Sequence, residues 1–241
     1  MGKYDAKMQY SKPDIANCYD YNRFTSTGDK MFDTIERAVI LSRLAPAVKG
    51  MVGLDVGTGT GRFALLLAEA GMNTVGCDVS RPMLDKARGK LSNRKLDGRV
   101  TLVNGDIYYL PFQDNSFDYV VCMRVLNQLG EKKYVRDAVK ELCRVCKRNG
   151  TIIFDFINSR SLARLAALSY SGLIAPGEVK TILHDIRGIE IRAIEGRLIL
   201  SQTLLRKVPK LLLNPMVRAD FVLSNRFPEY ATRVYFTLTK L

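Results

Sequence analysis

The sequence predicts an α/β protein built on a seven-stranded, mostly parallel sheet with helices on both faces. From residue 51 onward, short apolar runs alternate with segments whose apolar residues recur at helical spacing. A glycine-rich turn follows the first apolar run, and aspartates follow the next two runs. Strands separated by helices pair in parallel and bury both faces of the sheet, and such sheets bind ligands where the strands end.

Composition narrows the class of protein. The chain has 241 residues, with 37 Lys+Arg against 24 Asp+Glu and a net charge of +13. A hydrophobic share of 47% and a charged share of 25% are typical of a globular protein. There is no apolar run of about 18 residues to cross a membrane and no apolar signal-peptide core at the start. We therefore expect a cytoplasmic protein with a single domain over residues 1–241.

The five cysteines form no even disulfide framework. Cys143 and Cys146 make one CxxC pair, without a second pair or a nearby histidine to complete a zinc site. The pair lies in a segment, 131–148, whose apolar residues recur at helical spacing. We expect structural cysteines in a helix and no metal; metal or redox use is the alternative.

The elements can be assigned in chain order. Residues 1–50 should form a tyrosine-rich arm and a helix that begins near Thr27 and stops before Pro46. Residues 51–195 should form the core, 196–229 a helical cover, and 230–241 the last strand. Strands are expected at 52–56, 74–78, 100–103, 119–123, 151–156, 189–194 and 233–239, and core helices at 62–70, from Ser80, 131–148 and 176–186.

The turn after the first strand is the most informative stretch. Gly57, Gly59 and Gly61 allow a sharp strand-to-helix turn and the close approach of a ligand to the backbone. A dinucleotide GxGxxG motif would need glycine at position 62, where Arg62 stands, so the spacing excludes a nicotinamide site of that type. The pattern is instead an acidic residue, Asp55, followed by three alternating glycines.

Two further aspartates follow the next two strands. Asp78 ends the second strand, at a place where a carboxylate can accept both hydroxyls of a ribose. Asp106 and Ile107 follow the third strand and would suit the amino group and the face of an adenine. One such aspartate alone would more often be a helix cap or a solvated charge, but three acids at successive strand ends indicate a nucleoside site.

Together these motifs resemble those of class I S-adenosylmethionine-dependent methyltransferases, especially the branch with ubiquinone- and menaquinone-biosynthesis enzymes. The resemblance implies a Rossmann-like fold, an S-adenosylmethionine cofactor and methyl transfer. It covers roughly residues 51–156 and is carried by five motifs: Leu54–Gly61, Gly76–Ser80 with Met83, Gly105–Ile107 with Leu110–Phe112, Phe117–Val121 with Val125 and Leu126, and Lys147–Ile153.

The resemblance also implies roles for individual residues. Asp55 would lie beside the amino group of the cofactor, and Asp106 would take the amino group of its adenine. The turn would approach the methionine part of the cofactor, and Asp78 would bind its ribose. The implied cofactor-binding residues are Asp55, Gly57, Thr58, Gly59, Gly61, Asp78, Val79, Met83, Asp106, Ile107 and Met123, with Met83 and Ile107 around the adenine and Met123 beside the sulfonium.

No catalytic residue can be assigned. Many relatives carry a histidine after the fourth strand, where this chain has Asn127 and Gln128. The sole histidine, His184, falls in an expected helix beyond the fifth strand and should have a surface or packing role. The polar candidates for contact with the methyl acceptor are Tyr10, Tyr19, Tyr21, Asn127 and Gln128.

The amino-terminal arm and the cover leave alternatives open. The arm is either a packed segment or a lid from which Tyr21 or Arg23 reaches the cofactor carboxylate. The cover, 196–229, carries basic residues such as Arg206, Lys207 and Lys210 among leucines. It is either a solvated amphipathic cover on the sheet or a functional segment. A functional cover could enclose a small-molecule or lipid acceptor, touch a membrane surface, or help to bind RNA. We expect a small or lipophilic acceptor; an RNA methyltransferase is the alternative and a non-catalytic binding domain a third hypothesis. The oligomeric state is not indicated.

Overall fold

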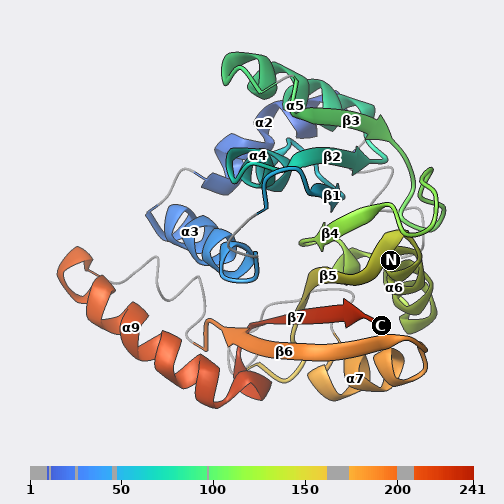
Figure 1. The fold of residues 1–241 in the computed structure, drawn as a ribbon. Helices are drawn as coiled ribbons and strands as arrows, with labels where there is room; N and C mark the ends of the chain where they lie inside the picture. Colours follow the sequence, from blue (N-terminus) through green and yellow to red (C-terminus); the bar gives the residue numbers. More distant parts are fainter. Residues whose placement is uncertain are drawn as a thin grey trace.

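The sheet confirms the predicted fold class. The computed structural model describes residues 10, 12–24, 27–44, 48–96, 98–161, 174–199 and 209–241. Seven strands lie in the order β3-β2-β1-β4-β5-β7-β6, and helices pack around them (Figure 1). The first five strands pair in parallel, whereas β7 is antiparallel to both β5 and β6.

The strands lie where the short apolar runs predict them. Cys77 and Cys122 are buried, in agreement with the apolar runs in which they occur. The sixth strand is longer than expected: β6 continues to Arg197, two residues past the expected end of the core at 195. The division of the chain into arm, core and cover stays a prediction. The strands are β1 (Val52–Val56), β2 (Asn73–Asp78), β3 (Val100–Asn104), β4 (Phe117–Cys122), β5 (Cys146–Ile157), β6 (Ile189–Arg197) and β7 (Arg233–Lys240).

The CxxC segment corrects one boundary. The helix expected over 131–148 ends at Val145, and Cys146 has an extended backbone (φ −71°, ψ 139°) as the first residue of β5. Cys146 leaves the helical pattern because it pairs with Phe117 of β4, so sheet pairing overrides the local helical periodicity. Cys143 is therefore helical and Cys146 is not. Burial raises the pKa of each thiol to about 12, so both are held as thiols.

The helices cover the two faces of the sheet. Alternate residues of the central strands face opposite sides: Tyr119 and Val121 pack with α3 and α4, whereas Val120 and Cys122 pack with α6 and α7. Both faces are thus buried, as the apolar strands require. The helices are α2 (Pro13–Phe24), α3 (Thr27–Leu41), α4 (Arg62–Glu69), α5 (Arg81–Asn93), α6 (Lys132–Val145), α7 (Pro176–His184) and α9 (Lys210–Arg226), with short 3-10 turns η1 (Leu126–Gln128) and η3 (Pro228–Tyr230).

A buried carboxylate attaches α3 to the ends of two strands. Glu36 is 0% exposed; its Oε2 accepts from Arg62 at 2.5 Å and its Oε1 from Arg124 at 2.8 Å. Arg62 follows the glycine turn, and Arg124 follows β4. Burial alone would raise the pKa of Glu36, but Arg124, Arg62 and Arg233 together lower it below its usual value. The carboxylate is therefore charged and held between guanidinium groups.

A second buried pair continues this cluster into the sheet. Asp155 of β5 pairs with Arg233 of β7, and its Oδ1 accepts from the backbone N–H of Arg124 at 2.6 Å. The Phe32 ring of α3 lies under both arginines, with 4.4 Å from its centroid to the Arg124 guanidinium and 5.4 Å to that of Arg233. The segment that follows β4 is thus fixed from α3, β5 and β7 at once.

Removing the charge of Glu36 should cost much of the stability. Glu36→Gln keeps the side-chain shape but leaves the largely buried Arg124 without its carboxylate partner and Arg62 with Asp33 alone. We therefore expect the free energy of unfolding to fall by about 3–5 kcal/mol. The matched control is Glu69→Gln, because Glu69 is 34% exposed and also pairs with two arginines, Arg37 and Arg94. Urea titration of the control should show a loss of about 1 kcal/mol or less. Equal losses would contradict the assigned role.

The stability difference between wild type and Glu36→Gln should depend on pH. The folded-state pKa of Glu36 is lowered, so its stabilising effect is complete above the unfolded-state value of about 4.3 and is lost as the pH falls through the folded value. The stability gap between wild type and Glu36→Gln should therefore be constant from about pH 6 to 8 and narrow below about pH 4. A gap that widens on acidification would show that burial, not the arginines, controls this carboxyl group.

Candidate functional site

The glycine turn after β1 adopts a backbone that favours glycine. Gly57, Gly59 and Gly61 all have positive φ, at 70°, 54° and 82°. A Cβ on Gly57 would lie 2.2 Å from Cγ2 of Val125, so the segment after β4 approaches the bare backbone of the turn. The N–H groups of Gly57 and Thr58 donate to the Cys77 carbonyl at the end of β2. The turn is therefore held against both neighbouring strand ends.

Asp55 supports the turn from within the protein. It is 1% exposed, and its Oδ2 accepts from Thr58 Oγ1 at 2.6 Å and from the N–H of Ala64 at 2.9 Å. Burial raises the pKa of Asp55 to about 6, although these hydrogen bonds oppose the shift. Asp55 does not line the pocket described below. Its observed hydrogen bonds lie within the turn, and its place beside the amino group of the cofactor stays a prediction.

Asp78 presents its carboxylate at the end of β2. Its Oδ2 accepts from the N–H of Gly59 at 2.7 Å, and its Oδ1 accepts from the N–H of Ser80 at 2.8 Å. Burial raises its pKa, and the two backbone hydrogen bonds oppose that rise. Each carboxylate oxygen has two lone pairs, so both can still accept from a ligand hydroxyl.

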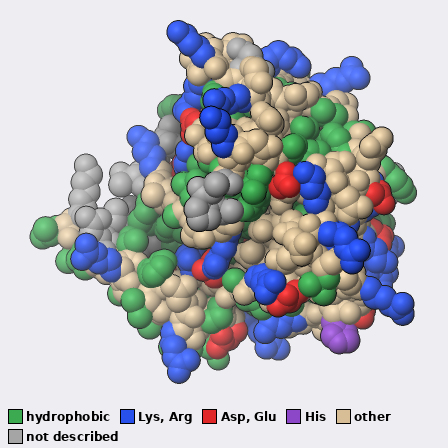
Figure 2. All heavy atoms as spheres, in the orientation of Figure 1, with side chains coloured by type: hydrophobic (Ala, Val, Ile, Leu, Met, Phe, Trp, Pro, Cys, Tyr) green, Lys and Arg blue, Asp and Glu red, His purple; other side chains and the backbone are tan. Residues whose placement is uncertain are grey.

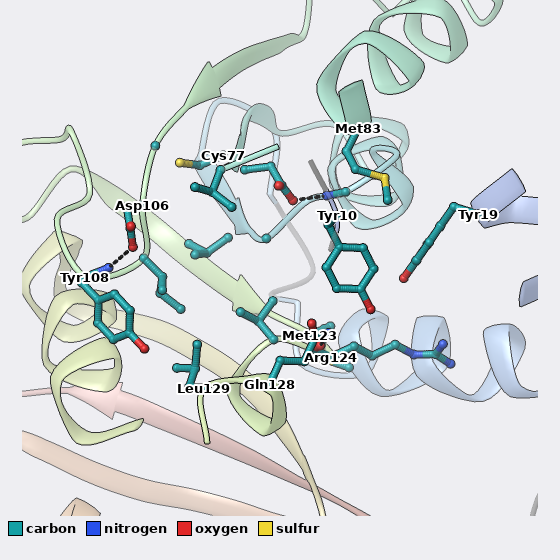
Figure 3. Close-up of a pocket in the computed structure, with 18 residues that line it drawn as sticks. Tyr10, Tyr19, Cys77, Met83, Asp106, Tyr108, Met123, Arg124, Gln128 and Leu129 are labelled. Atoms are coloured by element: carbon teal, nitrogen blue, oxygen red, sulfur yellow. Dashed lines mark hydrogen bonds between the residues drawn. The ribbon is translucent and has the colours of Figure 1, made fainter. Parts of the chain in front are cut away.

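Asp106 and Met83 border the same space from two other elements. The Oδ1 of Asp106 accepts from the N–H of Tyr108 at 3.1 Å, which closes a small turn and leaves Ile107 at its tip. Met83 is 2% exposed in the first turn of α5, where the Ser80 side chain accepts from its N–H. Both side chains lie around one pocket in Figure 3.

The pocket lies at the carboxyl ends of β1, β2, β3 and β4. It contains about 920 Å³ of space, part of it open to solvent, which falls in the range of small-molecule sites. Its lining combines the glycine turn, the two aspartates and apolar side chains from the segment after β4. The lining residues are Tyr10, Tyr19, Val56, Gly57, Gly59, Cys77, Asp78, Val79, Met83, Gly105, Asp106, Ile107, Tyr108, Met123, Arg124, Val125, Gln128 and Leu129.

Most residues predicted from the sequence meet in this pocket, and some do not. Thr58 lies instead in a smaller recess beside the turn, together with Thr60, Arg62 and Arg124. Gly61 packs toward Ala87 of α5. Tyr21 is 74% exposed, Asn127 is not part of the lining, and the side chain of Arg23 lies outside the described residues. The predicted residues that line the pocket are Tyr10, Tyr19, Gly57, Gly59, Asp78, Val79, Met83, Asp106, Ile107, Met123 and Gln128.

Arg124 is the main feature that sequence reasoning missed. It borders both the pocket and the recess, with 13% of its side chain exposed. Its φ of 62° is unusual for a residue other than glycine, and Glu36 fixes its Nε. Its position directly after β4 was the available signal, since ligands bind where such strands end. Tyr108 and Leu129 were missed in the same way.

Two tyrosines cover the pocket from the amino-terminal side. The rings of Tyr10 and Tyr19 meet edge to face, with centroids 6.1 Å apart, and the Tyr10 carbonyl accepts from Ser80 Oγ at 2.6 Å. Figure 3 shows both rings beside the side chain of Arg124. Asp20 of α2 accepts from Thr60 Oγ1 at 2.7 Å, which ties this helix to the glycine turn. The described part of the arm therefore packs over the site.

The described residues offer little support for chemistry based on a metal ion, a histidine or a reactive cysteine. No three of their His, Cys, Asp and Glu side chains are placed to hold a metal ion. His184 is exposed at the end of α7 and is not part of the pocket lining. Burial raises the pKa of Cys77, the one cysteine among the lining residues, to about 12.

Comparison with known proteins agrees with this geometry. The methyltransferase domain family matches residues 54–154. The demethylmenaquinone methyltransferase of Clavibacter sepedonicus is 33% identical over 180 residues, or 73% of this chain and 69% of that protein. The enzyme of the same name from Staphylococcus aureus (strain MRSA252) is 38% identical over 108 residues, 44% of this chain and 42% of that protein. The chain thus covers less than half of this second relative.

Solved structures share the fold over nearly the whole chain. The [4+2]-cyclase SpnF has a TM-score of 0.71 at 19% identity, covering 99% of this chain and 96% of that one. The magnesium protoporphyrin IX methyltransferase of Synechocystis PCC 6803, solved with its methyl donor, has a TM-score of 0.64 at 16% identity and covers 98% of both chains. These likenesses show the fold alone. The family is shown instead by the sequence of the Clavibacter sepedonicus relative, which is 33% identical over 69% of its length. On that basis the chain belongs to the class I S-adenosylmethionine-dependent methyltransferases.

Proposed function

We propose that the pocket holds S-adenosylmethionine across the glycine turn and that the enzyme methylates a small, largely apolar acceptor. The observation that carries this proposal is the meeting of Gly57, Gly59, Asp78 and Asp106 from three successive strand ends around one pocket. A Cβ on Gly59 would meet nothing within 4 Å, so the backbone here is open to a ligand. The cytoplasmic location stays a prediction from the sequence.

The lining suits the parts of the cofactor in order. Asp78 would accept from the ribose hydroxyls, while Asp106 would accept from the adenine amino group. Met83 and Ile107 would contact the faces of the adenine, and Met123 would lie near the sulfur. Asp55 would act indirectly, because its hydrogen bonds to Thr58 and Ala64 shape the turn.

Arg124 is the described cation best placed for the cofactor carboxylate. It reaches the recess beside the glycine turn, and its Nε is already bound to Glu36. A guanidinium carries four further N–H groups on its two Nη atoms, which suit a carboxylate. Arg62 borders the same recess, but both of its Nη atoms donate to acids of α3, Asp33 and Glu36. We thus propose Arg124 for this contact, beside Tyr21 or Arg23 as predicted from the sequence; the side chain of Arg23 lies outside the described residues.

The protein's contribution to methyl transfer is chiefly alignment. Bound S-adenosylmethionine supplies an electrophilic methyl group. The pocket must orient the acceptor in line with that group, and orientation alone can be worth about 7–11 kcal/mol. The lining contains no histidine, and its two carboxylates lie at the proposed nucleoside end. We therefore propose an acceptor, such as a phenol or quinol, that can lose its proton to water.

The acceptor end of the pocket favours an apolar molecule. Val125 and Leu129 border it with Tyr108, and Gln128 turns its Nε2 to the Arg124 carbonyl at 2.6 Å. The relative from Clavibacter sepedonicus is named for a demethylmenaquinone substrate, in keeping with this lining. RNA is the second candidate, since the net charge is +13. Arg206 and Lys207, which would grip phosphates, lie outside the described residues.

Two variants should separate the two ends of the cofactor. We expect Asp78→Ala to weaken S-adenosylhomocysteine and methylthioadenosine alike, by about 10- to 100-fold, because both ligands contain the ribose. Arg124→Gln should weaken only S-adenosylhomocysteine, by at least about 10-fold, because methylthioadenosine lacks the carboxylate. Isothermal titration calorimetry with the two ligands measures this pattern.

The control for these titrations is Arg88→Gln, which removes a 62% exposed arginine of α5 and should change neither affinity. Equal weakening of both ligands by Arg124→Gln would place Arg124 elsewhere than at the carboxylate. Failure of the wild type to bind either ligand would overturn the assignment of the pocket.

The acceptor class can be tested with labelled S-adenosylmethionine and a panel of quinols, phenols, amines and RNA. We expect transfer to an apolar phenol or quinol, and Leu129→Ala should raise the KM for that acceptor by about 10-fold through lost apolar contact. The Kd for S-adenosylhomocysteine should not change. The control Leu241→Ala truncates a 54% exposed leucine outside the pocket. Saturable transfer to RNA alone would favour the second candidate.

A further inference from the structure

The outward face of α9 is apolar and basic. Leu211 is 87% exposed and Val222 is 66% exposed, unusual values for large apolar side chains. Helical spacing places Leu211, Pro215, Arg218, Val222 and Arg226 on one face, all of them exposed. This outward face, defined by those five residues, extends over about 22 Å along the helix at 1.5 Å per residue.

The inward face of α9 is fixed to the sheet. Ser224 is 0% exposed, and its backbone approaches β6 so closely that a Cβ on Gly196 would lie 2.5 Å from its carbonyl oxygen. Asp220 is 3% exposed, and its Oδ2 accepts from the N–H of Leu198 at 3.0 Å. These contacts hold the helix in one orientation, so the outward face stays turned away from the protein.

The charges of α9 are sorted between the two faces. Asp220 is the one carboxylate in the helix sequence, and it points into the protein. Arg218 and Arg226 belong to the outward face, which therefore presents only positive charge. Figure 2 shows hydrophobic and Lys/Arg side chains together over this helix, at the lower left of the molecule. A partner of this face must accept apolar side chains and carry negative charge.

We propose that α9 docks the enzyme on the surface of an anionic lipid bilayer. Apolar side chains interspersed with arginines are typical of helices that lie in the interface, with arginines at the headgroups and leucines in the acyl boundary. RNA phosphates would form ion pairs with the arginines but would make no apolar contact with Leu211 or Val222. The helix would lie on the bilayer rather than cross it, as no described helix is long and apolar enough to span one.

The absence of tryptophan from the chain allows a direct probe. In Val222→Trp, the single tryptophan emission should shift to the blue on adding vesicles with phosphatidylglycerol, and brominated lipid should quench it. The control is Tyr109→Trp, at a 77% exposed position after β3, whose emission should not change. β3 lies at the edge of the sheet opposite to β6, the strand that α9 contacts. Because neither cofactor nor acceptor is added, the result is independent of the proposed methyl transfer.

Vesicle sedimentation of charge variants tests whether the arginines of α9 attract the protein to anionic lipid. Arg218→Glu with Arg226→Glu should reduce binding to phosphatidylglycerol vesicles by at least about 10-fold. The matched control, Arg136→Glu with Lys140→Glu, makes the same charge change at two exposed positions of α6 and should retain most of the binding. Circular dichroism and thermal unfolding verify that each variant is folded.

The outcomes decide the proposal. A blue shift in the Val222→Trp variant together with selective loss in the α9 charge variant supports docking through this face. Equal loss in both charge variants would mean that net charge alone attracts the protein, which overturns the assignment to α9. Absence of a blue shift with anionic vesicles also overturns it, as does binding of RNA that the vesicles do not compete away.

Discussion

Much of the site depends on one carboxylate that is shut off from water. Glu36 holds Arg62, which begins the helix after the glycine turn, and Arg124, which follows β4. Both arginines border the recess, and Arg124 also borders the pocket. A buried ion of this kind is costly to desolvate, and replacement by apolar residues is often neutral for stability. Its retention is better explained by geometry, because it sets the distance between a strand end and a neighbouring turn.

The site also combines rigid and covering elements. The glycine turn is hydrogen-bonded to the Cys77 carbonyl at the end of β2 and to Asp55 beneath it, so this part of the pocket is rigid. Tyr19 lies on α2 and Tyr10 precedes this helix, so both approach the pocket from outside the sheet. The described part of the arm agrees with the packed segment considered from the sequence. The lid considered beside it stays a prediction.

The sequence was sufficient for the parts of the fold that rest on local patterns. Short apolar runs located all seven strands, and the spacing of glycines and aspartates located much of the lining of the pocket. Cys146 was misplaced because its pairing partner, Phe117, is distant in sequence and local periodicity cannot report that contact. Asp55 received its cofactor role from the family resemblance, and that role stays a prediction; its described hydrogen bonds lie within the turn. The position of Arg124 after β4 was readable from the sequence, but its fixation by Glu36, 88 residues earlier, was not.

The position of β7 has a consequence for how the protein acquires its structure. β7 lies between β5 and β6, although it follows both of them in the chain (Figure 1). During synthesis β6 therefore emerges before its partner strand. It can pair with β7 only after residues 233–240 are made. The half of the sheet from β3 to β5 can pair earlier. Closure of the sheet is thus a late event with long-range contacts, and an incomplete chain leaves an open strand edge on β5 that is prone to intermolecular pairing.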